Sequence, residues 1–449
     1  MELDEKVLAA SRRYAATLDG RGVSPTVDAL AALSVFRHKL PAAGLPPGEI
    51  VDRLDRVGSP ATVATNGPRF FGFVTGAVLP AAAAAHNLAA AWDQNTALAA
   101  MSPVSAEIET VTLEWLRGLL GIPATALGSF VTGATMANFT GLAAARHSLL
   151  LRLDWEVEAR GLFGAPAIQV VVGDEVHVSL IKALGMLGLG RERVIRVPTD
   201  GQGRMRVDSF PKLQAPAIVC LQAGNVNTGA LDPAAELIAL AHESKSWVHV
   251  DGAFGLWANA SPALKGLATS YEDADSWATD CHKWLNVPYD SGLAFVRKPT
   301  DLTGALATQA SYLPDGATAD IEAMHRGPES SRRARAIDAW AAMLSLGSDG
   351  VAALIDGCCA HARHFAASLG STPGCTILND VVLNQVLVAL ETDERTSAWI
   401  DAIQAEGTCW CGGTVWHGRK AMRISVSSWM TTKNDVERSI AAMLLCRPA

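Results

Sequence analysis

The chain has 449 residues, of which 49% are hydrophobic, and it carries a formal net charge of −8 with a pI near 5.8. This length predicts two or three domains with a large core. The mildly acidic balance, without a basic run or stripe, argues against a nucleic-acid partner.

The N-terminal region carries no targeting pattern. Met1–Lys6 is charged and lacks the apolar core of a signal peptide. The Ala-rich stretch Gly76–Trp92 is the best membrane candidate, but Pro80, His86 and Asn87 interrupt it and it is short for a span. We therefore expect a buried helix there, and a soluble, cytoplasmic protein with no membrane partner.

The eight cysteines are scattered apart from Cys358-Cys359 and the pair Cys409 and Cys411. Neither pair has zinc-like spacing with matching His ligands, so no metal site is expected. The cysteines are predicted to be buried free thiols in a reducing compartment.

From about residue 105 the hydrophobic pattern alternates between short apolar runs and longer amphipathic segments, which predicts an α/β domain with a mainly parallel sheet. Ligands of such domains bind at the carboxyl ends of the strands. After about residue 345 a helix, a strand, a second helix and another strand predict a smaller α+β domain. Helices are expected at 107–120, 136–151, 178–187 and 351–369, and strands at 168–172, 193–197, 217–221, 247–251, 292–296, 381–390 and 421–426.

Two polar segments follow predicted strands in the first half of this domain. Thr132–Asn138 is a turn of small residues before a helix, where backbone amides and the helix N-terminus favour a phosphate and Thr135 adds a hydroxyl. Mere packing of small residues is the alternative. His177 follows the strand at 168–172 and is placed either to stack on an aromatic ring or to cap a helix.

Two further residues complete the pattern. Asp251 ends an apolar strand. A carboxylate at this place either holds a pyridine nitrogen protonated or caps a helix. Lys283 follows His282, and its neighbours Trp277 and Trp284 argue against a solvated surface lysine. The order of phosphate turn, stacking His, Asp and Lys predicts a pyridoxal phosphate enzyme in which Lys283 forms a Schiff base with the cofactor.

The segments 249–254 (His-Val-Asp-Gly-Ala-Phe) and 282–285 (His-Lys-Trp-Leu) resemble the group II pyridoxal-phosphate-dependent decarboxylases, which include aromatic amino acid and glutamate decarboxylases and aldehyde synthases. The resemblance extends from Phe70 to Ser425. It implies the fold-type-I transferase fold, with a mainly parallel seven-stranded sheet, and a homodimer with active sites at the subunit interface. The expected division is an N-terminal segment at 1–78, a large cofactor domain at 79–345 and a small C-terminal domain at 346–449.

The resemblance also implies roles for individual residues. Ala134, Thr135 and His282 are implied to contact the phosphate of the cofactor, and Asn225 is implied to make a further cofactor contact. His177 would stack on the ring, Asp251 would pair with the pyridine nitrogen and Ala253 would pack below the ring. Lys283 would be attached covalently to the cofactor. The substrate-pocket candidates are Phe73, Thr75, Trp92, Asn95 and Arg423, of which Arg423 is either a carboxylate clamp or part of a structural ion pair.

The chain departs from its relatives at three places. Asp280 stands where relatives often have an Asn, and Asn225 opens a segment that is usually Thr-rich. In the loop between 312 and 332, decarboxylases often carry a Tyr that protonates the carbanion, whereas Glu322 or Ala323 stands there in this chain. His325 and Tyr312 are then the candidate general acids.

The expected function is decarboxylation of an L-amino acid to an amine and CO2 by a carboxy-lyase. The alternatives are an aldehyde synthase, in which oxygen intercepts the intermediate, and a transaminase or aldolase of the same fold. A cofactor-free structural relative is disfavoured because Lys283 and Asp251 are both present.

Overall fold

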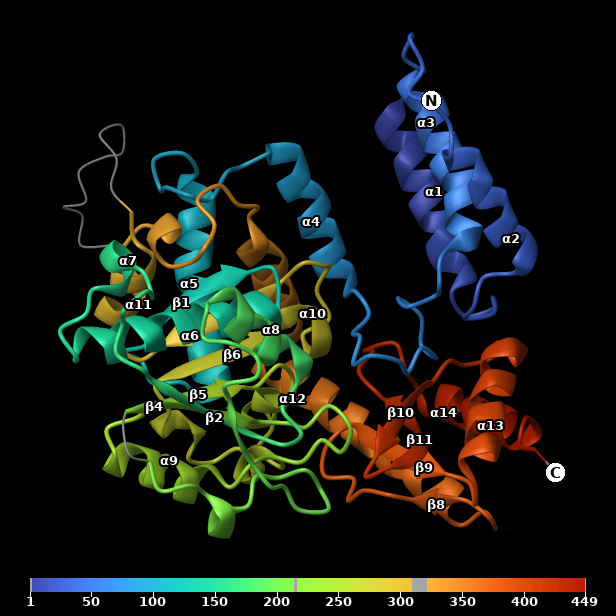
Figure 1. Cartoon of the computed structure of the whole chain (residues 1–449). Coiled ribbons are helices and arrows are strands. Elements are labelled where there is room, and N and C mark those ends of the chain that lie inside the picture. The colour runs from blue at the N-terminus through green and yellow to red at the C-terminus, as the bar shows by residue number, and fades with distance from the viewer. Residues whose placement is uncertain (1, 214–215, 309–320, 449) are drawn as a thin grey trace. The chain divides into compact units, whose positions relative to one another are not determined.

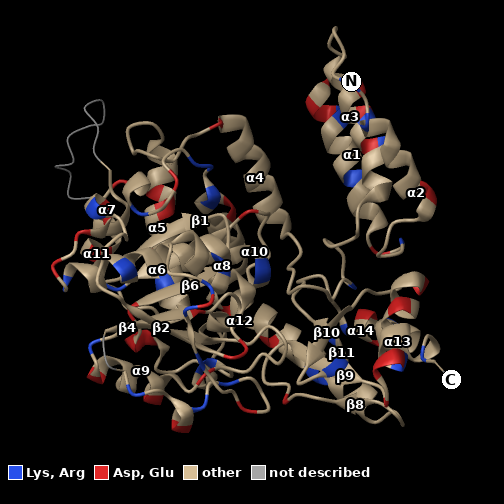
Figure 2. Ribbon diagram, in the orientation of Figure 1, with Lys and Arg blue, Asp and Glu red and all other residues tan. Residues whose placement is uncertain are grey.

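The computed structural model describes residues 2–213, 216–308 and 321–448, and it divides into two compact units. One unit comprises residues 78–362 and 379–385. The other comprises residues 1–77, 363–378 and 386–449. Lys and Arg, like Asp and Glu, are spread over both units (Figure 2).

The larger unit is built on a seven-stranded sheet with the order β1-β7-β6-β5-β4-β2-β3. Strands β6, β5, β4, β2 and β3 are parallel, and β7 runs antiparallel to both β6 and β1, which confirms the mainly parallel sheet expected from the sequence. The strands are β1 (Leu127–Val131), β2 (Gln169–Gly173), β3 (Ile195–Val197), β4 (Ala217–Gln222), β5 (Trp247–Asp251), β6 (Ser276–Asp280) and β7 (Gly292–Val296).

Helices of the same unit surround this sheet (Figure 1). Helix α6 packs against β5, β6 and β7 and against α8. The apolar side chains between α6, α8, β2 and β4 are almost wholly buried and form a core. The helices are α4 (Pro80–Trp92), α5 (Pro103–Leu120), α6 (Ala134–Leu151), α7 (Val157–Arg160), α8 (Val178–Met186), α9 (Ala234–Glu243), α10 (Cys281–Trp284), α11 (Pro299–Leu306) and α12 (Arg335–Gly370).

The smaller unit combines N-terminal helices with a four-stranded sheet of order β10-β11-β9-β8. Its segments are tied together by the buried side chain of Arg69, which donates to Asp19 and Asp435. This small sheet belongs to the α+β region that the sequence predicts after about residue 345. The elements are α1 (Leu3–Thr17), α2 (Val27–Ala32), α3 (Pro47–Arg53), β8 (Thr376–Ile377), β9 (Gln385–Ala389), α13 (Asp393–Glu406), β10 (Gly412–Trp416), β11 (Arg419–Ser425) and α14 (Lys433–Leu445).

Three expectations need correction. Helix α6 begins at Ala134 and not at 136, because its N-cap is Gly133 in the turn itself. Strand β3 covers only Ile195–Val197, because this edge strand pairs with the last residues of β2 alone. The Ala-rich helix α4 is not buried within the chain, since Leu88 is 51% exposed and Trp92 is 39% exposed.

Helix α12 is the one helix among residues 2–213, 216–308 and 321–448 that is long and apolar enough to cross a membrane. It is interrupted at Gly347, whose φ of 64° and ψ of 176° are not helical, and it fully buries Ala339, Ala342 and Ile355. It is therefore a core helix of the kind found in soluble proteins. The eight cysteines are free, and six of them are buried as expected, whereas Cys375 and Cys446 are half-buried.

Candidate active site

The carboxyl ends of the neighbouring parallel strands bring the predicted residues of the larger unit to one edge of the sheet. Asp251 closes β5 and is paired with Ala278 of β6, so Asp280 lies two residues further along the same edge. On the other side of β5, Asp251 is paired with Gln222, the last residue of β4. The turns that follow β4, β5 and β6 therefore converge, as expected for an α/β sheet.

Lys283 lies on the short helix α10, which follows β6 directly. Its side chain is 18% exposed, and its Nζ lies 2.8 Å from Oδ2 of Asp280. Trp277 and Trp284 are fully buried on either side of this turn in the sequence. The lysine is thus held at the edge of the core and is not a solvated surface residue.

The other oxygen of Asp280 closes the N-terminus of α6. Oδ1 accepts a hydrogen bond from the backbone N of Ala134 at 2.6 Å and lies 3.6 Å from Nε2 of His282. A Cβ on Gly133 would meet Cε1 of His282 at 3.2 Å and Oδ1 of Asp280 at 3.5 Å. A side chain at Gly133 would therefore crowd both His282 and Asp280. Thr135 follows in the first turn of the same helix.

His282 is fixed from its other side by the segment after it. Its Nδ1 accepts from the backbone N of Ser291 at 3.1 Å, and its ring packs against Tyr289 with centroids 4.3 Å apart. Burial lowers the pKa of His282, and the Asp280 carboxylate opposes that shift. The imidazole is therefore held near an anion but inside the protein, where it is ready to donate from Nε2.

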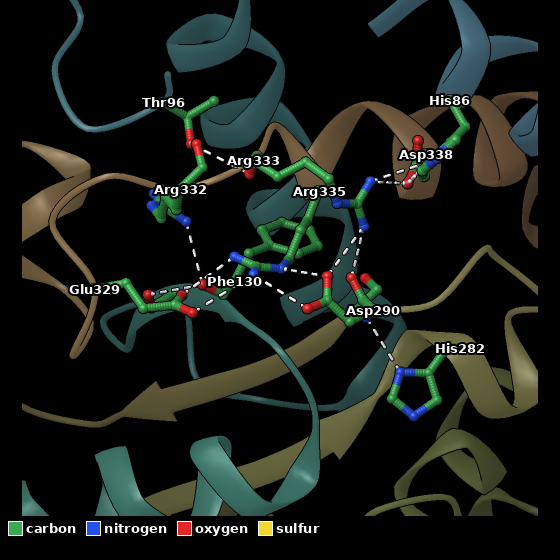
Figure 3. A network of polar contacts seen from close by, with 12 residues as sticks. His86, Thr96, Phe130, His282, Asp290, Glu329, Arg332, Arg333, Arg335 and Asp338 are labelled. Atoms are coloured by element: carbon green, nitrogen blue, oxygen red, sulfur yellow. Dashed lines mark hydrogen bonds and ion pairs between the residues drawn. The ribbon is translucent and has the colours of Figure 1, made fainter. Parts of the chain in front are cut away.

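A cluster of arginines holds the loop that contains Asp290 (Figure 3). Arg335 and Arg333 reach the Asp290 carboxylate at 3.0 Å and 3.3 Å, and although burial raises the pKa of Asp290, these two guanidinium groups lower it overall. Arg333 also donates to Asp338, which is fully buried. Since Ser291 follows Asp290, this network positions the amide that holds His282.

The second half of the site lies around Asp251, which is 5% exposed. Its Oδ2 accepts from Nδ2 of Asn138 at 3.0 Å, and its Oδ1 accepts from the backbone N of Ala253 at 3.3 Å. His177 caps α8, because its side chain accepts a hydrogen bond from Ser179. Capping is one of the two roles that the sequence left open for His177, the other being ring stacking. The Ser179 hydroxyl in turn lies 3.4 Å from Nδ2 of Asn138 and so links His177 to Asp251.

Asn225, after β4, has a buried and unsatisfied donor. Its Oδ1 accepts from the backbone N of Asn227 and of Thr228, but its Nδ2 has no hydrogen-bond partner among the residues described. An unpaired buried donor costs free energy unless a ligand satisfies it. This makes Asn225 a suitable contact for a polar ligand group.

The remaining candidates lie in other segments of the chain. Asn95 bonds Ser331 and the backbone of Arg332, and Trp92 ends α4. His325 lies on a 3-10 turn at 323–325. In the smaller unit, Phe73 stacks on Trp410, and Thr75 lies two residues after Phe73. Arg423 lies on β11, and burial lowers its pKa. Tyr312 falls outside the described residues.

Sequence reasoning missed three residues that the structure brings into the site: Asn138, Ser179 and Tyr289. Asn138 lies four residues after Ala134 and therefore on the same face of α6. That spacing was a usable signal. No sequence signal indicated the contact of Tyr289 with His282, because this contact depends on the path of the loop before β7.

The fold and this site define a pyridoxal phosphate-dependent lyase of fold type I: an anion-binding helix N-terminus, a buried carboxylate and a half-buried lysine lie at one sheet edge. Residues 36–391 match the family described as the pyridoxal-dependent decarboxylase conserved domain. The chain belongs to this family of amino acid decarboxylases, and its cofactor is pyridoxal 5'-phosphate.

The chain is similar to proteins with different activities. The chain is 30% identical to the aromatic-L-amino-acid decarboxylase of Bacillus atrophaeus over 75% of this chain and 69% of the relative. It is 25% identical to the phenylacetaldehyde synthase of Arabidopsis thaliana over 75% of this chain and 73% of the relative. Its fold matches the crystal structure of Oryza sativa TDC with PLP and tryptamine at a TM-score of 0.92 and 21% identity, covering 99% of this chain and 96% of the other.

Proposed function

We propose that the protein decarboxylates an L-amino acid to the corresponding amine and CO2, with Lys283 as the covalent attachment point of the cofactor. The observation that carries this proposal is the meeting of Lys283, Asp251 and the Ala134 amide at adjacent strand and helix ends. Membership of the decarboxylase family supports it.

When bound, pyridoxal phosphate supplies an electron sink for the pair released as the Cα–carboxylate bond breaks. Asp251 holds a proton on the pyridine nitrogen, because a buried carboxylate stabilises an adjacent cation. The residues proposed to bind the phosphate are Ala134, Thr135 and His282; without the cofactor the Ala134 amide donates to Asp280.

The other proposed cofactor contacts orient the flat ring. Asn225 offers its unpaired Nδ2 to a polar group of the cofactor. His177 and Ala253 are the residues that would hold the ring in place. Lys283 supplies an amine, which must lose its proton before it attacks a carbonyl carbon.

The proton that replaces the carboxylate comes from a loop residue, for which we propose His325. Its Nδ1 is buried and has no hydrogen-bond partner among the described residues. Glu322, one of the two residues at the place of the relatives' Tyr, is already used, since its Oε2 accepts from the backbone N of Ala99 at 2.9 Å. Tyr312 is the other candidate acid.

Oxidative conversion to an aldehyde is the second candidate function. The similarity to a phenylacetaldehyde synthase favours it, as does the absence of a Tyr at 322 and 323. Transamination or aldol cleavage on the same fold is a third outcome.

We propose a homodimer as the active form, with α4 in the interface and Phe73, Thr75, Trp92, Asn95 and Arg423 as substrate-pocket residues. The exposed apolar side chains of Leu88 and Trp92 on α4 support this arrangement. The names of the relatives point to an amino acid with an aromatic side chain as the first substrate class to test.

The test is a product analysis with the cofactor-loaded enzyme and the twenty amino acids. Amine and CO2 in equal amounts support the proposal. Aldehyde with ammonia and peroxide supports the second candidate, and a stable aminated cofactor without CO2 supports transamination. A matched His325→Gln variant that keeps cofactor binding but loses amine formation identifies the acid.

A further inference from the structure

Behind Asp251 runs a line of fully or almost fully buried polar side chains from three adjacent elements: β5, β6 and α6. Trp247 Nε1 lies 2.8 Å from Oγ of Ser276, and that oxygen lies 2.8 Å from Nδ1 of His249. Nε2 of His249 lies 2.9 Å from Oδ1 of Asn138, whose Nδ2 lies 3.0 Å from Oδ2 of Asp251. Ser276, His249 and Asn138 are each 0% exposed.

The chemistry of the two ends fixes the direction of every hydrogen bond in this line. The Asp251 carboxylate only accepts, so Asn138 turns its amide nitrogen to Asp251 and its Oδ1 to His249. Because Oδ1 only accepts, His249 donates from Nε2, and Nδ1 of the neutral ring accepts from the Ser276 hydroxyl, which itself accepts from the indole of Trp247. All donors therefore point toward the carboxylate.

The same asparagine sends a branch to His177. Its Nδ2 lies 3.4 Å from Oγ of Ser179, and that hydroxyl lies 2.8 Å from Nδ1 of His177. The backbone N of Ser179 also donates to Nδ1 of His177 at 3.3 Å. His177 thus has its Nδ1 as an acceptor and its proton on Nε2.

A glycine in the middle of α6 makes room for this line. A Cβ on Gly141 would lie 2.7 Å from both Cε1 and Nδ1 of His249 and 3.2 Å from Oγ of Ser276. Glycine weakens a helix interior relative to alanine. Its presence here is explained by the imidazole that packs against it, an observation independent of the hydrogen bonds.

We propose that His249 is a positioning residue which, with Ser276 and Asn138, aims a fixed hydrogen-bond donor at Asp251 and so holds that carboxylate in place as the acceptor toward the cofactor's ring nitrogen. A hydrogen bond from a fixed donor restricts the orientation of the carboxylate. A histidine with the opposite tautomer would turn the Asn138 amide and present an oxygen to Asp251. The inference rests on the proposed role of Asp251.

The test compares variants of His249 by cofactor affinity and by turnover in the loaded enzyme. His249→Gln keeps a donor near the position of Nε2, whereas His249→Leu removes it at similar volume. We expect His249→Leu to raise the cofactor dissociation constant about tenfold or more and to lower kcat more than it changes KM, while His249→Gln stays within about threefold of wild type. Equal effects of Gln and Leu would overturn the proposal.

Two further measurements separate this inference from the proposed function. Asp251→Asn should weaken cofactor binding; if it does so while His249→Leu does not, the positioning role is wrong but the role of Asp251 stands. If Asp251→Asn has no effect, the proposed function fails as well. Nitrogen-15 NMR of histidine-labelled holoenzyme, assigned with His249→Gln, should find His249 neutral with its proton on Nε2, and a proton on Nδ1 would refute the line of donors.

Discussion

One carboxylate bridges the lysine and the anion-binding turn of the site: Asp280 contacts Lys283 Nζ at 2.8 Å through Oδ2 and the backbone N of Ala134 at 2.6 Å through Oδ1. Relatives often have a neutral Asn at this position. A phosphate bound at the α6 N-terminus would therefore lie beside a negative charge that is 3% exposed. Cofactor loading has to overcome this repulsion.

We expect Asp280→Asn to tighten cofactor binding by about tenfold, because two like charges about 4 Å apart repel by roughly 1–4 kcal/mol. The Asn side chain still accepts from Ala134. The measurement is a cofactor titration at constant ionic strength. Asp208→Asn, which removes an exposed carboxylate paired with Arg206, is the charge-matched control. Weaker binding by Asp280→Asn would show that the carboxylate supports the phosphate.

Replacing Lys283 should abolish covalent attachment of the cofactor without unfolding the protein. Borohydride reduction of wild-type holoenzyme should leave one cofactor mass on the peptide that contains residue 283, and Lys283→Ala should leave none. Lys182→Ala, at an exposed lysine on α8, is the control and should keep the adduct. An adduct on a different lysine in the wild type would contradict the assignment.

The buried imidazole of His249 predicts a pH dependence of stability. Burial lowers the pKa of His249 to about 3, whereas an unfolded histidine has a pKa near 6.5. The unfolded chain therefore binds the extra proton between these values, so the contribution of His249 is complete above about pH 6.5 and falls as the pH drops toward 3. At pH 5 the loss is on the order of 2 kcal/mol.

Urea unfolding of wild type and His249→Gln at pH 7 and pH 5 measures this loss. The difference in the free energy of unfolding between the two proteins removes the contributions of other titrating groups. One such group is Asp232: burial raises its pKa to about 6, so its contribution has the opposite pH dependence. The gap between the proteins should narrow at pH 5. An unchanged gap would show that His249 does not carry this dependence.

The ion pair between Arg332 and Glu109 is fully desolvated, with side chains 2% and 4% exposed and a separation of 2.7 Å (Figure 3 shows Arg332). Arg332→Met leaves the Glu109 charge buried and unpaired, so we expect a loss of about 3–5 kcal/mol in the free energy of unfolding. The double variant Arg332→Met with Glu109→Leu should recover most of it. A double variant no more stable than the single one would contradict the pairing.

The exposed apolar residues of α4 predict an interface. Leu88→Glu and Trp92→Glu should shift the protein from dimer to monomer in sedimentation velocity experiments and lower activity with it. The control is Phe163→Glu, which removes an even more exposed side chain, at 98%, outside α4. Dimers that survive both α4 changes would exclude this helix from the interface.

The sequence by itself determined the fold class, the family and the cofactor. The strand ending at Asp251 and the small-residue turn before a helix are local patterns, whereas strand β6, which ends at Asp280, was not predicted from the sequence. Parallel strands bring their carboxyl ends to one edge of the sheet. For this reason Lys283, Asp251 and Ala134 were predicted together and lie together, although their roles toward the cofactor stay predictions.

Only the tertiary structure decided how these residues are held. The hydrogen bond of Asp280 with Ala134, the hydrogen bonds that lead from His249 through Asn138 to Asp251, and the approach of Gly141 to His249 join segments more than a hundred residues apart. Which side chains meet across neighbouring strands and a helix depends on strand order and register, and no local sequence pattern specifies these. The exposure of α4 was likewise decided by packing, since an Ala-rich helix reads as buried from composition alone.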